Sequence, residues 1–318
     1  MTKIEYFDVI IIGGSYSGLS AALSLGRALR KVLVIDSGTP CNEQSPHSHN
    51  FLTRDGETPA QLSKLAREEV LKYPSVSFLE DRVVATSRAE EHFRIQTVEK
   101  KLYSAKKIVF ATGLIDIIPE KAGFAECWGK SILHCPYCHG FENKNLTTGV
   151  FANGQAGYDQ AKFISNWTKD LVLYTDGKST LTEDQTRNLE RRNIPIEEKE
   201  IEGFEHSAGK IKNIVYKDGT KQALQVLYAS PEVKQQSDLP EELGCEFTEH
   251  GRIEVDVFQK TSVEGVYAAG DNSSMGRAVP VAVAAGSIAG VMLNKELIEE
   301  EFVEGKNIGN PDLVKENN

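Results

Sequence analysis

The chain has 318 residues and a formal net charge of -10, with 40% apolar and 26% charged residues. These values are typical of a soluble globular protein that is long enough for two domains. The acidic balance, without a run of lysines and arginines, argues against nucleic acid or an anionic membrane as a partner.

Targeting and membrane segments are not expected from the sequence. Residues 4–12 already form a strand pattern with an acidic residue inside it, which is not the pattern of a secretory leader. The longest apolar stretch, 279–293, is too short and too often broken by glycine to span a bilayer. The five cysteines do not resemble the framework of a secreted disulfide-rich domain. We therefore expect a cytoplasmic protein.

The first segment has the pattern of a dinucleotide-binding βαβ unit. A β-branched run at 8–12 leads into the turn 13–18 (Gly-Gly-Ser-Tyr-Ser-Gly), and a helical stretch rich in alanine and leucine follows at 19–29. The next strand ends on Asp36. The glycines permit a tight turn, the helix N-terminus faces a pyrophosphate, and the acid can bond a ribose hydroxyl. Ser15 stands at the second glycine position, and it is small enough to keep the approach open.

The following segments complete this first domain. Residues 41–56 form a polar loop that contains His47 and His49, and the sequence favours a solvated surface loop there. The elements expected next are a helix at 59–73, a strand at 76–79, a β-meander at 83–103 and a strand at 107–110. The last strand runs into Ala-Thr-Gly at 111–113, where glycine lets the backbone approach a cofactor closely.

A second, weaker βαβ pattern follows. The strand at 148–151 leads into the turn 152–157, in which Ala152 replaces the first glycine. The returning strand is followed by Thr-Asp-Gly at 175–177, with no arginine where a 2′-phosphate would lie. Arg191 and Arg192 come later, on a charged helix with a solvated face. Strands at 211–216 and 223–229 complete this domain.

The C-terminal part returns the chain to the first domain. Residues 252–256 bring it back, and the strand that follows at 265–271 ends on Gly270-Asp271. The helix expected at 277–293 is rich in small residues, which favours close packing on a neighbouring element. The tail from residue 295 is acidic and polar, and we expect it to be partly disordered.

The motif His134-Cys135-Pro136-Tyr137-Cys138-His139 carries the chemistry. Two cysteines separated by two residues can close a small disulfide ring, and a flanking histidine can carry a proton near neutral pH. The same residues also match a c-type haem attachment pattern, a row of four zinc ligands, or a pair of inert core thiols. The motif alone leaves these alternatives open.

Taken together, the motifs resemble low-molecular-weight thioredoxin reductases, which are FAD-dependent pyridine nucleotide-disulfide oxidoreductases. The matching features, in the family's order, are the turn 13–18 with Asp36, Ala-Thr-Gly at 111–113, the Cys135/Cys138 motif and Gly270-Asp271. The resemblance covers nearly the whole chain. It implies an α/β fold of two doubly wound, three-layer (Rossmann-like) domains. An FAD-binding domain of residues 1–117 and 247–318 would surround an inserted domain, 118–246, with the cysteines and a degenerate pyridine-nucleotide fold.

The resemblance also implies the roles of individual residues. Cys138 would face the flavin, Cys135 would meet the substrate, and His139 (or, less favoured, His134) would carry the proton. No metal is expected, and Cys41, Cys127 and Cys245 are isolated and interpreted as structural. The residues implied to bind FAD are Gly13, Ser15, Gly18, Asp36, Ser37, Asn50, Val83, Ala111, Gly113, Asp271, Arg277 and Ala278.

Two departures separate the chain from ordinary thioredoxin reductases. His139 stands where that family has an acid, and 175–177 stands where it has an arginine-rich NADPH motif. With the segment 277–280 (Arg-Ala-Val-Pro), these changes resemble thioredoxin reductase-like dithiol oxidases. We therefore expect oxidation of a dithiol through a Cys135–Cys138 disulfide and FAD, with oxygen as acceptor.

Other electron sources and partners stay open at this point. The alternatives are a thioredoxin reductase that uses NAD(P)H and a flavoprotein fed by a ferredoxin-like carrier. The expected partner is a small-molecule dithiol or a thioredoxin-like protein, and a homodimer is expected from the family.

Overall fold

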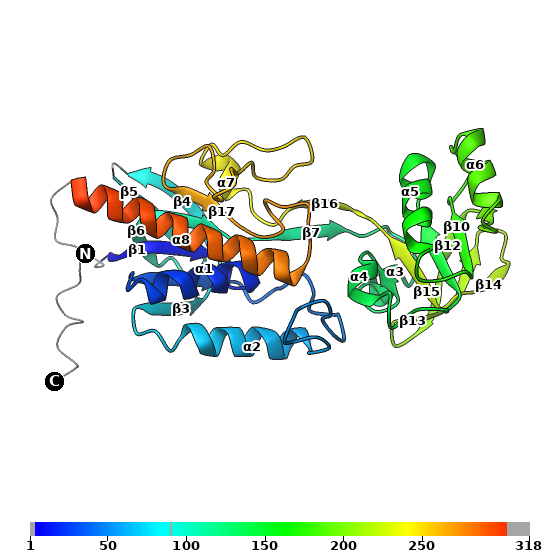
Figure 1. Ribbon diagram of the computed structural model, residues 1–318, viewed down its shortest axis with the longest axis horizontal. Coiled ribbons are helices and arrows are strands. Elements are labelled where there is room, and N and C mark those ends of the chain that lie inside the picture. Colours follow the sequence, from blue (N-terminus) through cyan, green and yellow to red (C-terminus); the bar gives the residue numbers. More distant parts are fainter. Residues whose placement is uncertain (1–3, 90, 304–318) are drawn as a thin grey trace. The chain divides into compact units, whose positions relative to one another are not determined.

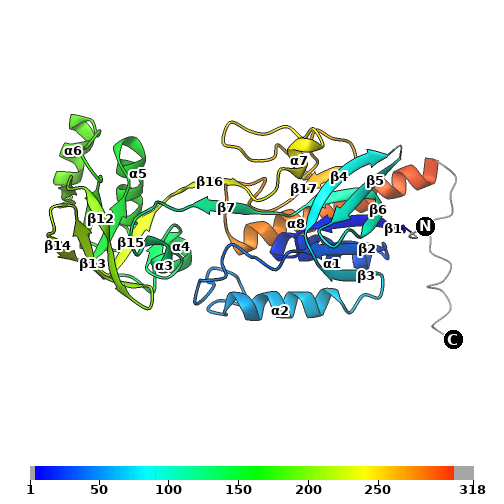
Figure 2. The same ribbon diagram turned by 180° about the vertical axis from the view of Figure 1, so that it is seen from behind.

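The computed structural model describes residues 4–89 and 91–303, which fold into two compact units (Figures 1 and 2). The described parts of Met1–Pro40, Ser63–Ile115 and Gln235–Asn318 form the first unit. The second unit comprises Cys41–Leu62 and Asp116–Lys234. The chain passes between the units in β7 (Leu114–Ile117) and β16 (Glu232–Gln235), and these two strands pair with each other.

The first unit is built on a mixed sheet with its long helices on one face and a short helix on the other. Its strands are β1 (Glu5–Ile12), β2 (Val32–Asp36), β3 (Val76–Glu80), β4 (Val83–Ala89), β5 (His92–Thr97), β6 (Leu102–Phe110) and β17 (Val266–Ala268). Its helices are α1 (Tyr16–Arg27), most of α2 (Pro59–Val70), α7 (Leu239–Glu242) and α8 (Val279–Val303). The strand order is β3-β2-β1-β6-β5-β4, and β17 also pairs with β6.

Strand β6 joins the parallel and antiparallel parts of this sheet. One edge of β6 pairs in parallel with β1 from Tyr103 to Phe110. On the other edge, its first half pairs antiparallel with β5 and its second half pairs in parallel with β17. The meander and the following strand predicted from the sequence are therefore one continuous sheet. The parallel strands β1, β2, β6 and β17 end at one edge, which is where doubly wound sheets bind ligands.

Alternation along β1 divides the core of the first unit into two layers. Val9 and Ile11 face α1 and α8, while Ile10 and Ile12 face the meander and the chain around residues 239–266. A buried parallel strand is apolar on both faces, which explains the uninterrupted β-branched run in the sequence. The first unit therefore has three layers, as a doubly wound domain requires.

Helix α8 runs along α1 (Figure 1), and small residues bring the two helices close together. A Cβ atom on Gly286 would lie 2.0 Å from the carbonyl oxygen of Ser17, so only glycine fits there. The sequence predicted this close packing but ended the helix at residue 293, ten residues too early. Among the described residues, α8 is the one helix long and apolar enough to cross a membrane. Its contacts with α1 make it a core helix of this unit.

The second unit has a five-stranded parallel sheet between two helices and a small antiparallel sheet. Its parallel strands, in spatial order, are β11 (Ile196–Glu197), β10 (Leu171–Tyr174), β9 (Thr148–Phe151), β15 (Val226–Ala229) and β8 (Ile132–Leu133). The antiparallel sheet holds β12 (Ile201–Ser207), β13 (Lys210–Tyr216) and β14 (Lys221–Ala223). The helices are α3 (Phe124–Cys127), α4 (Pro136–His139), α5 (Gly154–Ile164) and α6 (Glu183–Glu190).

Strand β15 shows how these layers are assembled. Val226 and Tyr228 pack with α5 and α6, whereas Leu227 and Ala229 pack on the antiparallel sheet. Both units are thus doubly wound α/β domains, as the sequence predicted. Strand β12 was not predicted. In the returning segment 252–256, Ile253 forms an isolated bridge with Phe247.

The boundaries of the units differ from the predicted domain limits at two places. Residues 235–246 were assigned to the inserted domain, but Leu239 and Cys245 pack in the core of the first unit beside Ile10 and Val83. The loop 41–62, assigned to the first domain, groups with the second unit. Neither change could be seen from composition, because both segments are polar or mixed in character.

Candidate active site

The redox motif forms the short helix α4 directly after β8, at the carboxyl edge of the parallel sheet of the second unit. Cys135 and Cys138 are joined by a disulfide, with their Cα atoms 5.3 Å apart. Cys135 is the N-cap of α4, and its Sγ accepts a hydrogen bond of 3.1 Å from the backbone N–H of Cys138. A donor aimed at a sulfur stabilises that sulfur as a thiolate once the disulfide opens. The disulfide also uses both thiols that a zinc ion or a thioether-linked haem would require.

Aromatic side chains flank the disulfide. Tyr137, between the two cysteines, is exposed and makes an edge contact of 5.4 Å with the ring of Trp167. Phe163 of α5 contacts both rings at 5.8 and 5.5 Å. The short helix is therefore held by ring packing on α5.

His139 follows the second cysteine at the end of α4. Burial, with a smaller effect from the charge of His49, lowers the pKa of His139, while the carboxylate of Glu142 acts in the opposite direction. The lowered pKa makes a neutral imidazole the main form at neutral pH. A neutral imidazole can accept a proton from a thiol.

His134 lies on the other side of the motif, at the end of β8. Its ring is tilted against that of Trp128, with 6.0 Å between centroids. His134 is thus a partly buried residue that packs against Trp128. This packing does not favour His134 over His139 as the proton carrier.

The turn between β1 and α1 lies at the carboxyl edge of the sheet of the first unit. Gly13 has a φ of +108, and a Cβ atom on it would lie 2.2 Å from the carbonyl oxygen of Ala111. The turn therefore packs on the end of β6 backbone to backbone. Ser15 is the N-cap of α1 but makes no side-chain cap hydrogen bond, and the first turn contains no acidic residue. An uncapped helix start without a carboxylate suits a pyrophosphate group.

Asp36 ends β2 beside this turn. Its Oδ1 accepts from the backbone N–H of Gly14 at 2.8 Å, and its Oδ2 accepts from that of Gly38 at 3.2 Å. Two backbone donors fix the carboxylate in the position that the family uses for an adenosine ribose. Ser37 is exposed next to it, and its hydroxyl lies 3.1 Å from that of Thr39.

The ends of β6 and β17 meet through Asn272. Its amide nitrogen donates to the carbonyl of Phe110 at 2.9 Å, and its buried Oδ1 has no hydrogen-bond partner among the residues that the structure describes. A buried amide oxygen without a partner is rare, and it fits a donor supplied by a bound group. Asp271 lies 3.3 Å from the guanidinium of Arg277, shortly before α8 begins. This edge therefore has the features that an FAD molecule requires.

The structure brings together most of the residues predicted to bind FAD. Those at this edge of the first unit are Gly13, Ser15, Gly18, Asp36, Ser37, Ala111, Gly113, Asp271, Arg277 and Ala278. Val83 begins β4, but its side chain is 7% exposed and lies in the core, so only its backbone is available. Asn50 belongs to the loop that groups with the second unit.

In the second unit, the corresponding turn between β9 and α5 is closed by Asn153. Its Oδ1 accepts from the backbone N–H of Gly154 at 2.7 Å and from that of Thr180 at 2.9 Å. Its amide nitrogen donates to the carbonyls of Thr175 and Lys178. Asn153 thus caps α5 and ties the loop 175–180 to the turn, where a dinucleotide would place its pyrophosphate.

Asp176 is also engaged by its own domain. Its carboxylate lies 2.9 Å from the ammonium of Lys121 and accepts from the backbone N–H of Ile201 at 2.7 Å. Lys121 in turn donates to the carbonyl of Ile201. The carboxylate of Asp176, which could have accepted a hydrogen bond from a ribose hydroxyl, therefore already binds Lys121 and Ile201 of its own unit.

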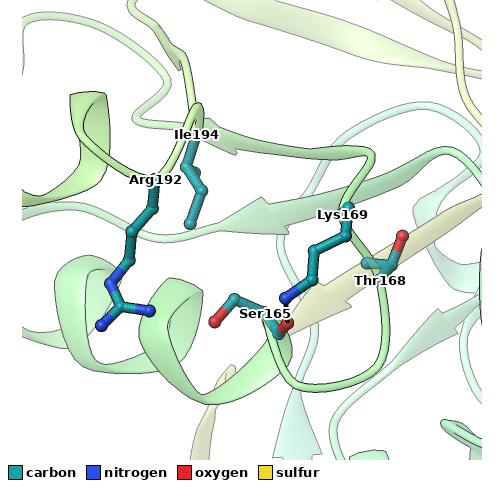
Figure 3. A pocket seen from close by; sticks show the side chains of 5 residues that line it. All are labelled: Ser165, Thr168, Lys169, Arg192 and Ile194. Carbon is teal, nitrogen blue, oxygen red and sulfur yellow. Dashed lines mark hydrogen bonds between the residues drawn. The ribbon is translucent and has the colours of Figure 1, made fainter.

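A basic pocket lies at the other edge of this sheet (Figure 3). It is lined by Ser165, Thr168, Lys169, Arg192 and Ile194, which precede β10 and β11. Because the strands begin there, the pocket is at the opposite end from the turn that Asn153 closes. The ammonium of Lys169 donates to the carbonyl of Ser165 and so stabilises the C-terminal end of α5.

The remaining cysteines lie apart from this chemistry. Cys127 and Cys245 are buried, and burial raises the pKa of both thiols, which makes them unreactive. Cys41 is exposed. Among the described residues, no group of three or more His, Cys, Asp or Glu side chains is arranged to hold a metal ion.

Comparison with known proteins agrees with this geometry. The family model of the pyridine nucleotide-disulphide oxidoreductases matches residues 7–286. The chain belongs to this family. It is a thioredoxin reductase-like FAD enzyme that acts on sulfur groups.

Individual relatives span nearly the full length. A protein named thioredoxin reductase tcpT, from Claviceps purpurea (strain 20.1), is 32% identical over 94% of this chain and 97% of its own length. The solved structure described as HlmI has a TM-score of 0.89 and 34% identity, covering 94% of this chain and 95% of its own. A putative thioredoxin reductase TrxB from Bacillus anthracis gives a TM-score of 0.89 and 30% identity, covering 93% and 100%.

Several residues of this oxidoreductase were not singled out from the sequence. They are Asn153 and Lys121 in the closed turn, Asn272 at the FAD edge, and His49 with Glu142 near His139. Asn153 had a readable signal, because asparagine before a helix start is a favoured N-cap. The other contacts join distant parts of the chain and leave no local pattern.

Proposed function

We propose that the enzyme oxidises a small-molecule dithiol to a disulfide through Cys135 and Cys138, with oxygen as the final electron acceptor. The observation that carries this proposal is the closed turn at Asn153. A dinucleotide needs the N-terminus of α5 for its pyrophosphate, and this chain fills that position with its own side chain and loop. Electrons therefore enter from the thiol substrate.

The exchange begins at the sulfur of Cys135. A substrate thiol gives its proton to His139, and the resulting thiolate attacks Cys135, so that a mixed disulfide forms and the Cys135–Cys138 bond breaks. The second substrate thiol then gives its proton to the Cys138 thiolate released in the first step and attacks the substrate sulfur of the mixed disulfide, which breaks its bond to Cys135. The substrate leaves as a cyclic disulfide, and Cys135 is released as a thiolate that the N–H of Cys138 stabilises and that the protonated His139 then protonates. Two electrons and two protons have passed to the cysteine pair, which is now a dithiol.

FAD would be held at the edge formed by the uncapped start of α1, Asp36, Asn272 and Asp271. When bound, it supplies the two-electron acceptor that reoxidises the cysteine pair and the reaction with oxygen that yields hydrogen peroxide. The overall balance is one dithiol and one O₂ giving one disulfide and one H₂O₂.

A second candidate is an ordinary thioredoxin reductase, fed by NAD(P)H and acting on a thioredoxin-like protein. What favours it is the naming of relatives, such as the Claviceps purpurea protein called a thioredoxin reductase. Against it stand the lack of an arginine after β10 and the engagement of Asp176 by Lys121. A ferredoxin-like carrier as electron source is a third possibility. In each case we propose a cytoplasmic homodimer, as is usual in the family.

Anaerobic mixing of the FAD-loaded enzyme with one reductant at a time tests the proposal. We expect fast bleaching of the flavin by a vicinal dithiol and slow bleaching by NADPH. Two charge-assisted bonds to a 2′-phosphate are worth about 3–6 kcal/mol, so their loss weakens NADPH binding about 10²–10⁴-fold. Admission of air should then consume one O₂ per dithiol and produce peroxide. Rapid bleaching by micromolar NADPH would instead support the thioredoxin reductase.

A further inference from the structure

The loop 47–57 is a folded element, although its sequence favours a solvated surface loop. The backbone N–H of Ser48 donates to the carbonyl of Glu57 at 2.7 Å, and that of Gly56 donates to the carbonyl of Ser48 at 2.9 Å. The Nδ1 of His47 lies 2.9 Å from the carbonyl of Gly56. These cross-links fix the loop, so the direction of its side chains is set by the fold.

The loop holds His49 between two carboxylates. The Nδ1 of His49 lies 3.6 Å from Asp55, and its Nε2 lies 3.6 Å from Glu142. Asp55 is itself fixed, because it accepts from the backbone N–H of Asn50 at 2.7 Å. The side chain of His49 is only 18% exposed, so water screens these charges less than on an open surface.

Glu142 belongs to the redox segment. It lies three residues after His139, and Asn143 fastens this turn by donating from its side chain to the carbonyl of His139 at 2.8 Å. The titratable groups that act on His139 are Glu142 and His49. Those that face Glu142 and His49 are Asp55, the ring of His47 at 6.3 Å from that of His49, and the buried Tyr228.

We propose that His49 is a positioning residue of the redox site, which acts through Glu142 on the proton that His139 carries. The inference rests on the proposed thiol–disulfide exchange at Cys135 and Cys138. Glu142 contacts the imidazole of His49 at 3.6 Å and lies one turn after His139, so it links the loop to the turn that carries His139. A positive charge on His49 therefore makes a proton on His139 less favourable, whereas the charge of Glu142 makes it more favourable.

The two partners of His139 must then have opposite effects. The negative charge of Glu142 favours the protonated form of His139, whereas the positive charge of His49 disfavours it. Removing the negative charge of Glu142 therefore lowers the pKa of His139. Removing the positive charge of His49 raises it. A purely structural role for the loop would not give shifts of opposite sign.

The experiment follows the rate at which dithiothreitol reduces the Cys135–Cys138 disulfide between pH 5 and 9, without oxygen. Samples of the FAD-loaded enzyme are quenched with acid and alkylated, and mass spectrometry counts the free thiols. The pH midpoint should move down by about 0.5–1 unit in Glu142→Gln and up by a similar amount in His49→Gln. The shift should be smaller in Glu142→Asp, which keeps the charge, and the His139-dependent limb should disappear in His139→Ala.

His250→Gln is the control, because His250 is an exposed histidine of the first unit that pairs with Glu249 rather than with Glu142. Its midpoint should stay at the wild-type value. Shifts of the same sign in Glu142→Gln and His49→Gln, or no shift in either while the wild type reacts normally, would overturn the inference alone. A wild-type disulfide that resists the dithiol would overturn both this inference and the proposed function.

Discussion

At the scale of single residues, the two cysteines are chemically distinct although they form one disulfide. The backbone N–H of Cys138 points at the sulfur of Cys135, which is the N-cap of α4. The sequence predicted the disulfide-bonded pair, because both cysteines are contained in one short motif, and the role of His139 as proton carrier stays a prediction. The sequence could not show which charged groups act on His139, since Glu142 and His49 come together only in the folded chain.

Trapping experiments can assign the cysteines. With Cys138→Ser, the free thiolate of Cys135 should attack the disulfide reagent, keep one half of it as a mixed disulfide and release the other half as a thiol. This mixed disulfide should persist, because the variant lacks the partner thiol that would displace it. With Cys135→Ser, no such adduct should accumulate. A monothiol disulfide reagent and intact-protein mass spectrometry under non-reducing conditions would measure the adduct. An adduct of equal yield on Cys138 in the Cys135→Ser variant would reverse the two assigned roles.

At the scale of elements, sequence periodicity was a good guide where an element is buried on both faces. The strands β1, β2 and β9 and the helices α1 and α5 follow directly from apolar runs and glycine turns. The last ten residues of α8 were not predicted as helix because they are rich in glutamate, which is typical of a solvated tail. Tertiary contacts hold this part as a helix: Lys107, buried beneath it, bonds to Glu296 and Glu300.

The ion pairs under α8 should make the first unit sensitive to acid. Burial acts to raise the pKa of Glu296, but hydrogen bonds from Lys107, Lys260 and Tyr267 outweigh it and lower the pKa to about 2. Because the folded pKa is below the unfolded one, this stabilisation is present above about pH 4.5 and is lost as the pH falls toward 2.

Glu296→Gln should therefore destabilise the protein by up to about 3 kcal/mol at pH 7 and by much less near pH 3. Urea unfolding at both pH values, followed by circular dichroism, measures the difference. Glu299→Gln is the control, since the exposed Glu299 pairs only with Lys295 on the same helix. An equal loss of stability at both pH values would show that Glu296 acts through packing rather than charge.

At the scale of the whole molecule, both units are doubly wound domains, but they differ in whether a side chain caps the helix that follows the first strand. In the first unit, Ser15 leaves the start of α1 without a side-chain cap, β2 ends on Asp36, and Asn272 lies against the end of β6. In the second unit, Asn153 caps α5 and binds the loop 175–180. A charged ligand at a helix start must replace whatever caps it, so the first unit can take a dinucleotide at lower cost than the second.

This contrast predicts which cofactor stabilises the protein. Flavin-stripped enzyme should be stabilised by FAD, by about 2.7 kcal/mol at a free concentration a hundred times its Kd, and the thermal unfolding midpoint should rise accordingly. FMN should stabilise it far less, because it lacks the adenosine ribose that we propose Asp36 binds. NADPH should have little effect, because Asn153 occupies the turn that it would need.

Asp36→Ala should reduce the stabilisation by FAD by about 1–3 kcal/mol, the cost of a lost hydrogen bond to a charged group. The matched control is Asp184→Ala, which removes an exposed carboxylate at the start of α6, with a side chain 82% accessible. Differential scanning fluorimetry on both variants, with and without each cofactor, provides the measurement. Equal stabilisation by FMN and FAD, or an unchanged response to FAD in Asp36→Ala, would refute the role assigned to Asp36 at the edge of the first sheet.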